Sequence, residues 1–310
     1  MKKINLLVVI VVASAVCGYA QQPVTTTTTS NTPPTQKPSS SSSSVLGPGS
    51  GVNNNIFIPE HLPNRKPIPY VYEREADIMW SKRIWRVIDL REKINHPLYY
   101  PGKENTQKPS LFAVIQKGIA TGELSVYDPN PAVFTPDQEF QIEYTPTQAQ
   151  KSYIHEVTIN VQDTTTGELI PTSKPDTFFC EDIKQYWLKE DWYFEKQRSV
   201  MDVRILGIAP VVEKVDEKGE FKAYQVLFWL YYPGCRNYFA KFQCYNPYND
   251  AEWRTYDEIF HKRLFSSFVK QESNVYNRII GSYAHNMDAL LESERIKDDI
   301  FKFEHDMWHL

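Results

Sequence analysis

Two histidines near the C-terminus come nearest, by type and spacing, to a metal site. His305 and His309 are four residues apart, so both imidazoles would share one face of a helix, with Glu304 and Asp306 beside them. The glutamate that acts as general base in a His-Glu-x-x-His metalloprotease is misplaced here, and no third ligand is suggested elsewhere. The pattern favours histidines that interact with the carboxyl end of a helix, so we predict neither a metal nor a cofactor.

Cysteines supply the second candidate chemistry. Cys235 and Cys244 are nine residues apart, and a loop of that length is easily closed by a disulfide in an oxidising compartment. They are the candidate disulfide pair, which would leave Cys180 as a free thiol. A catalytic cysteine would need a partner histidine and an electropositive setting, and nothing local in the sequence supplies them.

The common catalytic motifs are missing from the sequence. It has no Gly-x-Ser-x-Gly nucleophile elbow, no Walker loop and no dinucleotide-binding fingerprint. Any acidic chain contains carboxylates that could form a catalytic pair, so a secreted or periplasmic hydrolase that uses such a pair stays open as an alternative. We predict a binding or scaffold protein rather than an enzyme, with no catalytic residues and no small-molecule substrate.

Composition narrows the class of protein further. The 310 residues include 34 basic and 38 acidic side chains, for a formal net charge of −4, whereas a nucleic-acid-binding domain is expected to be strongly basic. We therefore predict no nucleic-acid partner. Aromatic residues make up 14% of the chain and gather in 187–194 and 228–238. Such residues fill cores, and they also anchor protein interfaces.

The first twenty residues have the pattern of a secretory signal peptide. Two lysines precede an almost purely apolar run, and the small residues Gly18 and Ala20 suit cleavage between Ala20 and Gln21. The alternatives are an uncleaved anchor helix, for which the run is short, and a lipoprotein signal with Cys17 as the lipidated residue. We predict cleavage and delivery to the periplasm.

Residues 21–55 differ in composition from the rest of the chain. They are rich in Ser, Thr and Pro, and Lys37 is their only charged residue. Their few apolar side chains cannot offset the entropy lost on ordering the backbone. We therefore predict a disordered linker. Residues 56–310 then form the predicted globular domain.

The domain is predicted to be α+β, with an N-terminal helix, a central and mainly antiparallel sheet, and a C-terminal helical region. Apolar residues at helical spacing predict helices over 73–94, 111–119, 256–268 and 288–310. Asn249 or Asp250 is the expected cap of the third. In the last helix, the stripe that includes Ser293, Ile296 and Ile300 predicts a core-facing side, with a short coiled-coil seam as the alternative.

Alternation of apolar and polar residues predicts the strands. Val157, Ile159 and Val161 indicate one strand, and 203–215 with 224–232 indicate a hairpin. Pro210 is expected to cap or bulge the first strand of that hairpin. In the return strand, apolar and aromatic residues occur at both parities over 228–231. Both faces should therefore be covered, either by layers of this domain or, on one side, by a partner.

Six runs of the sequence are specific in combination. They are residues 73–86, 200–205, 257–260, 265–268, 272–276 and 290–297. Together they resemble the GldN/PorN family of the gliding-motility and type IX secretion machinery of Bacteroidetes. The resemblance covers roughly Tyr70 to Leu310 and implies no catalytic residues.

The resemblance also implies partners and a location. It implies a structural subunit that associates with itself and with an outer-membrane lipoprotein, GldK/PorK-like, in a ring-like periplasmic complex. It further implies contact with an inner-membrane motor protein, GldM/PorM-like. The subunit would be attached to the inner face of the outer membrane through its partner.

Overall fold

The computed structural model describes seven stretches of the chain. They are residues 65–102, 108–129, 139–162, 169–215, 221–249, 252–276 and 278–307. They belong to the compact unit Pro59–Leu310. The predictions for the signal peptide, its cleavage between Ala20 and Gln21, and the linker 21–55 lie outside the described residues.

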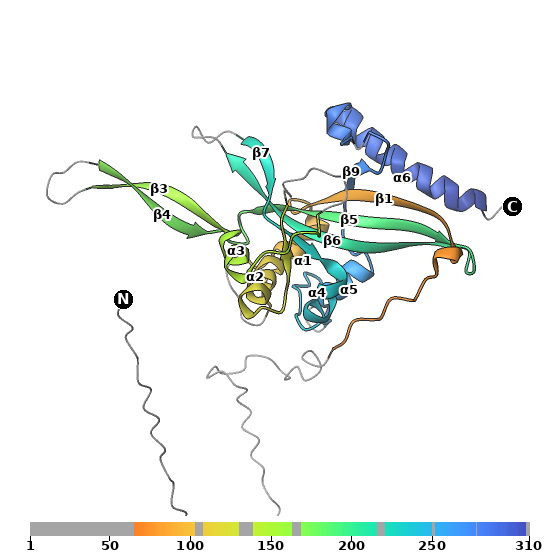
Figure 1. Ribbon diagram of the computed structural model, residues 1–310, viewed down its shortest axis with the longest axis horizontal. Helices are drawn as coiled ribbons and strands as arrows, with labels where there is room; N and C mark the ends of the chain where they lie inside the picture. Colours follow the sequence, from red (N-terminus) through yellow and green to blue (C-terminus); the bar gives the residue numbers. More distant parts are fainter. Residues whose placement is uncertain are drawn as a thin grey trace, which may run out of the picture. The chain divides into compact units, whose positions relative to one another are not determined.

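Strands and helices both contribute to this unit (Figure 1). The strands are β1 (Ile78–Asp89), β2 (Val126–Tyr127), β3 (Ile154–Gln162), β4 (Leu169–Thr177), β5 (Ile183–Glu195), β6 (Val200–Val215), β7 (Phe221–Val226), β8 (Trp229–Tyr231) and β9 (Phe268–Glu272). The α-helices are α1 (His96–Tyr99), α2 (Leu111–Thr121), α3 (Pro146–Lys151), α4 (Tyr232–Phe239), α5 (Tyr256–His261) and α6 (Met287–Met307). Short 3₁₀ turns are η2 (Glu75–Asp77), η3 (Lys93–Asn95) and η4 (Ile280–Ser282).

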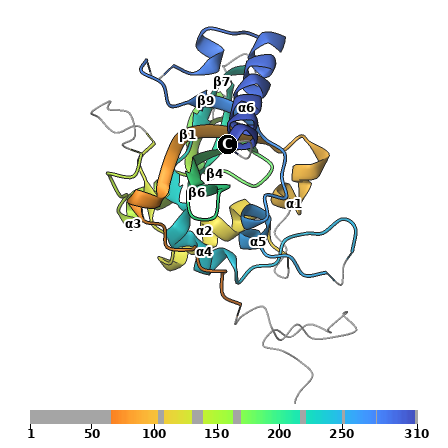
Figure 2. The ribbon, with the colours of Figure 1, turned by 90° about the vertical axis from the view of Figure 1, so that its right-hand side faces the viewer.

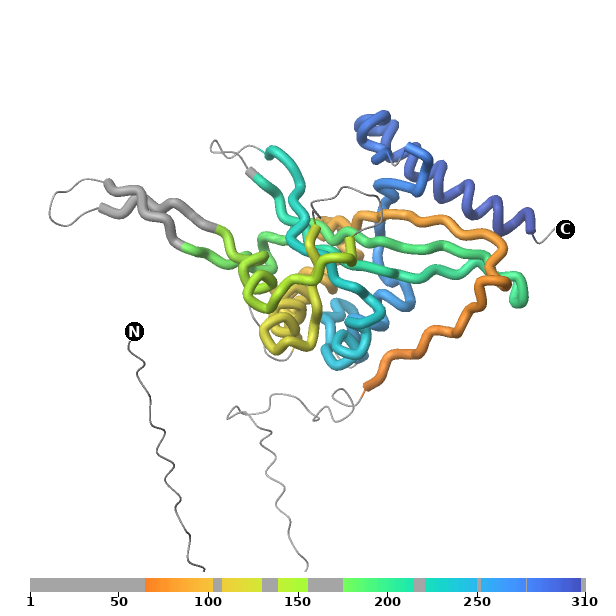
Figure 3. Tube along the Cα trace, in the orientation of Figure 1, coloured from red at the N-terminus to blue at the C-terminus, as the bar shows by residue number. Residues whose placement is uncertain are grey.

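A seven-stranded antiparallel sheet forms the centre. Its strands follow the order β2-β8-β6-β5-β1-β9, and β7 pairs with β6 as well. Figure 3 shows β1 running beside β5 although about a hundred residues separate them in the sequence. A smaller sheet consists of β3 and β4, and β3 is the strand predicted from Val157, Ile159 and Val161. The α+β class and the mainly antiparallel sheet are confirmed.

The predicted N-terminal helix over 73–94 is wrong, because this segment holds η2 and the strand β1. β1 pairs with β5 on one side and β9 on the other, and the positions from Ile84 to Ile88 are all buried. A strand covered on both faces loses its alternation of apolar and polar residues. Its apolar residues then fit the spacing of a helix as well as that of a strand. The helical spacing decided the prediction, although the β-branched and aromatic residues of this segment favour a strand.

Two predicted helices are confirmed, with α2 over Leu111–Thr121 and α6 over Met287–Met307. The third is shorter than expected. α5 ends at His261, and Thr255 caps it by accepting a hydrogen bond from the Glu258 amide (3.3 Å), in place of Asn249 or Asp250. Phe268, expected on that helix, instead begins the edge strand β9.

The predicted hairpin is present, but its return strand is split into β7 and β8. Pro210 lies inside β6, where the neighbour changes from one to the other, rather than at a cap. It has no N–H to donate, and its carbonyl accepts from the Leu227 amide between the two strands (3.1 Å). Trp229 and Leu230 are both buried, so both faces of β8 are covered within the domain, whereas Tyr231 at its end is 42% exposed.

Helices cover the sheet in two places (Figure 2). Residues of α2, α4 and α5 pack with one face of the sheet in the largest apolar cluster. A second cluster joins Ile296 and Ile300 of α6 to β1 and β9, which confirms the stripe as core-facing. Within it, the buried Ser293 hydroxyl accepts a hydrogen bond from the Val269 amide (2.7 Å). α6 thus satisfies a backbone donor of the edge strand β9.

A buried ion pair joins α4 to α5. The Arg236 guanidinium donates to both oxygens of Asp257 (2.8 and 3.3 Å), and the Tyr232 hydroxyl donates to the same carboxylate (3.0 Å). Both charged side chains are almost fully buried. The ring of Tyr70 lies 4.1 Å from the guanidinium, so the pair also holds the extended segment that enters the domain.

Removing one member of this pair should cost much of the stability. We expect Asp257→Ala to lower the free energy of unfolding by about 3–5 kcal/mol, because it leaves the Arg236 charge buried and unpaired. Urea unfolding measures the change. The exposed pair Lys241–Glu123 provides the control, since Glu123→Ala should change stability by less than about 0.5 kcal/mol. Equal effects of the two variants would contradict the prediction.

Candidate functional site

Strand β9 carries one extra residue opposite β1, and that residue is Lys270. Trp85 pairs with Gln271 and the next residue, Arg86, pairs with Val269, so Lys270 has no partner position. A bulge of this kind re-aims a side chain out of the regular alternation of a strand. Here it brings the Lys270 amine to 2.8 Å from the centroid of the Trp187 ring, on β5.

Lys270 and Trp187 lie where two surface hollows of about 450 and 410 Å³ meet. Tyr224 of β7 and Ile279 also line both hollows. The first continues over the sheet past Trp85, Glu139, Lys214 and Trp229, and the second continues past Val87, Ile280 and Leu290 to the beginning of α6. We call the two hollows together the Lys270 cleft.

The Lys270 amine has no acidic partner in the part of the chain that the structure describes. Burial lowers its pKa from 10.5 to about 7. The acid that lines the cleft, Glu139, is already engaged, because it accepts hydrogen bonds from Lys189 (2.5 Å) and from the Trp85 indole (3.2 Å). Lys270 is therefore a half-buried cation whose counter-charge the cleft does not supply.

The floor of the cleft is held by packing. Lys189 is 1% exposed, and its amine lies 5.4 Å from the Trp85 ring and 5.5 Å from the Phe140 ring. Gly207 makes the close approach of Phe140 possible, since a Cβ there would lie 2.4 Å from the Phe140 Cζ. The side chains that form this part of the cleft are therefore held in place by packing.

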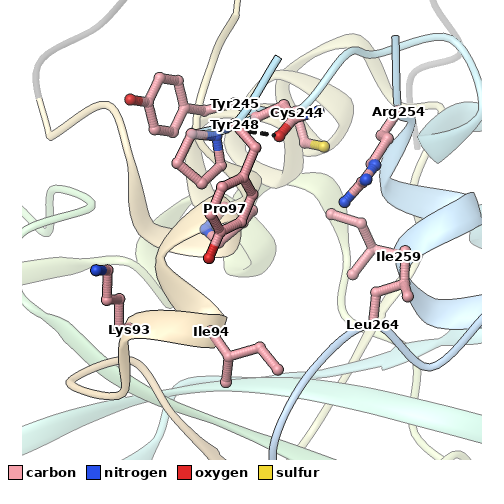
Figure 4. A pocket seen from close by; sticks show the side chains of 11 residues that line it. Lys93, Ile94, Pro97, Cys244, Tyr245, Tyr248, Arg254, Ile259 and Leu264 are labelled. Carbon is pink, nitrogen blue, oxygen red and sulfur yellow. Dashed lines mark hydrogen bonds between the residues drawn. The ribbon is translucent and has the colours of Figure 1, made fainter. Parts of the chain in front are cut away.

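A third hollow, of about 250 Å³, lies near α1 and α5 (Figure 4). Figure 4 shows Tyr245, Tyr248 and Pro97 along one side and Arg254 with Leu264 on the other. Arg254 is already paired with Glu252 (2.7 Å). This hollow therefore offers mainly aromatic and apolar surface.

One close pair of carboxylates bears on the hydrolase alternative. Burial and a hydrogen bond with Glu195 raise the pKa of Glu73. Arg198 donates to both carboxylates, with 2.6 Å to Glu73. Neither acid lines the Lys270 cleft or the hollow of Figure 4. The pair therefore acts as a clamp that holds the segment before β1 against the end of β5.

The three described cysteines are buried and are free thiols in the structure. Burial raises the pKa of Cys235 and of Cys244 to about 12, so neither is an activated nucleophile. The bridge between Cys235 and Cys244 is thus not formed here and stays a prediction for the oxidised protein. The measurement is the number of cysteines labelled after unfolding without reductant, which is one with the bridge and three without it.

The predicted histidine positions are only partly described. His305 lies on the exposed side of α6, and His309 lies outside the described residues. Within the described stretches, no group of three or more His, Cys, Asp or Glu side chains is arranged to hold a metal ion. No described helix has both the length and the apolar character needed to cross a membrane. No sequence pattern pointed to Lys270, because the bulge that places it arises from strand pairing.

The fold and the cleft together describe an antiparallel α+β domain with an aromatic, cationic surface cleft. The family model of the gliding motility associated protein GldN matches residues 73–309, so the chain belongs to the GldN family. A search among curated proteins finds no match. Membership confirms the resemblance found in the sequence runs. It makes the chain a gliding-motility-associated protein, in a family of structural motility components.

Burial of the Lys270 amine should make the free energy of unfolding depend on pH, and replacing Lys270 by methionine should remove this dependence. The pKa of Lys270 is lower in the folded state than in the unfolded state. Below about pH 7 the folded state therefore bears the full free-energy penalty of a buried charge, and this penalty decreases as the pH rises toward 10.5. We expect Lys270→Met to be more stable than the wild type near pH 6. Its advantage should shrink by up to about 1.4 kcal/mol per pH unit between the two pKa values.

Urea unfolding over this pH range measures the difference between the two proteins. Lys241→Met is the matched control, because this lysine is exposed and paired at the surface with Glu123. Its stability difference from the wild type should show no such slope. A Lys270→Met advantage that stays constant with pH would show that the amine is not buried as described.

Proposed function

We propose that this protein is a non-enzymatic structural subunit of the type IX secretion and gliding-motility machinery. In this proposal it associates with itself and with a GldK/PorK-like outer-membrane lipoprotein in a ring-like complex, and it contacts a GldM/PorM-like motor protein. The observation that carries the proposal is the family match over residues 73–309, which spans nearly all of the described domain.

An exposed apolar surface supports a role in assembly. Between β9 and the first turns of α6, large apolar side chains stand in solvent, with Val275 98% and Tyr276 75% exposed. Met287, Leu290 and Leu291 of α6 are exposed as well. Large apolar side chains in solvent are typical of a surface that a partner covers. Permanent complexes bury about 2,000–5,000 Å² and are more apolar than transient ones, so such a surface suits a permanent subunit.

The proposed location is the periplasm, at the inner face of the outer membrane and held there by a partner. It rests on the signal-peptide pattern and on the family. In this proposal the mature chain begins at Gln21, carries the linker 21–55 and folds from residue 56 onward. N-terminal sequencing of the mature protein should therefore start at Gln21. A start at Met1, or a lipid on Cys17, would contradict this location.

Deletion of the gene tests the function. We expect the deletion to block export through the type IX route, and gliding where the host glides, because the assembly would lack a structural subunit. A signal peptide fused to Phe57 onward should restore export, since the globular part makes the contacts. The secreted proteins are measured in the culture medium. Normal export in the deletion strain would refute the proposal, and failure of the fusion alone would assign a role to the linker.

A further inference from the structure

We propose that the Lys270 cleft binds an acidic segment of a partner protein, in which a carboxylate pairs with the Lys270 amine and adjacent apolar side chains enter the hollow beside α6. This inference deepens the proposed function and rests on it, because it names the surface and the chemistry of one partner contact. The carboxylate belongs to an Asp or Glu side chain of a different chain.

The first argument is the isolated cation. A charge taken out of water without a counter-charge is costly. The Lys270 amine lies over the Trp187 ring, but no hydrogen bond or ion pair joins it to an acid among the described residues. Two other buried cations of this domain are paired with acids, Arg236 with Asp257 and Lys189 with Glu139. A carboxylate from outside would give Lys270 the charge-assisted hydrogen bond that its neighbours already have.

The second argument is charge complementarity. Among the residues that the structure describes, the ionisable ones that line the cleft are Arg86, Glu139, Lys214, Tyr224 and Lys270. Glu139 is neutralised by Lys189, and the Arg86 guanidinium is bound to the Ser267 hydroxyl and carbonyl (both 2.9 Å). Of the described lining residues, the two lysines are then the charges left to face a ligand, in a chain whose overall charge is −4. A positively charged cleft on a chain of negative net charge attracts an acidic partner.

The third argument is the apolar hollow that adjoins the amine. Val87 and Trp187 on the sheet face Ile280 and Leu290 across it, and its volume of about 410 Å³ accommodates large side chains. An apolar anchor seated there would place a neighbouring carboxylate of the same segment beside Lys270. A sugar is disfavoured, because Trp85 and Trp229 are only 9% and 4% exposed and cannot offer their faces for stacking.

Zero-length cross-linking tests the contact in the assembled machine. A carbodiimide joins an amine to a carboxylate only where the two touch, forming an amide while the reagent takes up the water that is lost. In envelopes that contain the full chain, we expect mass spectrometry to find Lys270 linked to an Asp or Glu of another protein. The link should vanish in Lys270→Met and other links should persist. An unlinked Lys270 in an intact complex, or a link to a second copy of this chain, would overturn the proposal.

Synthetic peptides test the chemistry on the purified full chain. The probe is an acetylated hexapeptide with one Glu between Leu and Val residues, and its Gln counterpart is the matched control. We expect the Glu peptide to bind at least tenfold more tightly than the Gln peptide near pH 6.5. Lys270→Met should remove that difference, and Lys241→Met should preserve it. Equal binding of the two peptides to the wild type would overturn the proposal.

The cell-based outcome separates this inference from the proposed function. If deletion blocks export but Lys270→Met supports normal export and lacks the cross-link, the chain is a subunit whose assembly does not need this contact. If deletion itself leaves export intact, the proposed function fails whatever the peptides show. We expect the deletion to block export and Lys270→Glu, which reverses the charge, to reduce it more than Lys270→Met.

Discussion

The structure depends on two adjacent charges that are buried on opposite faces of the central strand. Lys189 and Glu190 follow each other in β5, so their side chains point to opposite faces, and both are inaccessible to solvent. Lys189 is paired with Glu139, and Glu190 with Arg263 (2.9 and 3.1 Å). Each pair brings a distant segment onto the sheet. A one-residue slip of β5 would exchange the two faces and leave both charges without partners, so the pairs specify the strand register.

The ladder between β1 and β5 is regular over most of its length, and irregularities lie in the ladders on either side of it, between Lys189 and Glu190 in β5–β6 and between Trp85 and Arg86 in β1–β9. β1 pairs with β5 without a break from Trp80 to Asp89, and it is the opposite side of β1, toward β9, that accommodates the bulge. The edge strand is kept in place by η4 and by α6, whose Ser293 accepts the Val269 amide. The same coverage closes one wall of the cleft. The placement of Lys270 over Trp187 is therefore a consequence of how the edge of the sheet is protected.

The elements whose sequence pattern is local were predicted. α2 and α6 were both predicted from apolar residues at helical spacing. The features that bound α2 in the structure, the Ser110 hydroxyl at its start and the left-handed Gly122 at its end, are local as well. β1 was missed because burial on both faces erased its period. β9 was missed because its short run continues the apolar stripe of α5. Lys270 could not be predicted, because its position depends on a bulge and on a tryptophan more than eighty residues away.

Family membership identifies the machine in which the chain works, whereas the cleft concerns how one contact within it is made. A cation with a pKa near 7 responds strongly to a new neighbour, since a partner carboxylate would raise that pKa again. Binding above pH 7 would then take up a proton at Lys270, and the contact would weaken as the pH rises. Glu139 does not compete, because Lys189 holds it, and Lys214 favours the same carboxylate. In the proposed contact, assembly would remove the penalty that the free subunit bears at Lys270 and would so stabilise the assembled state.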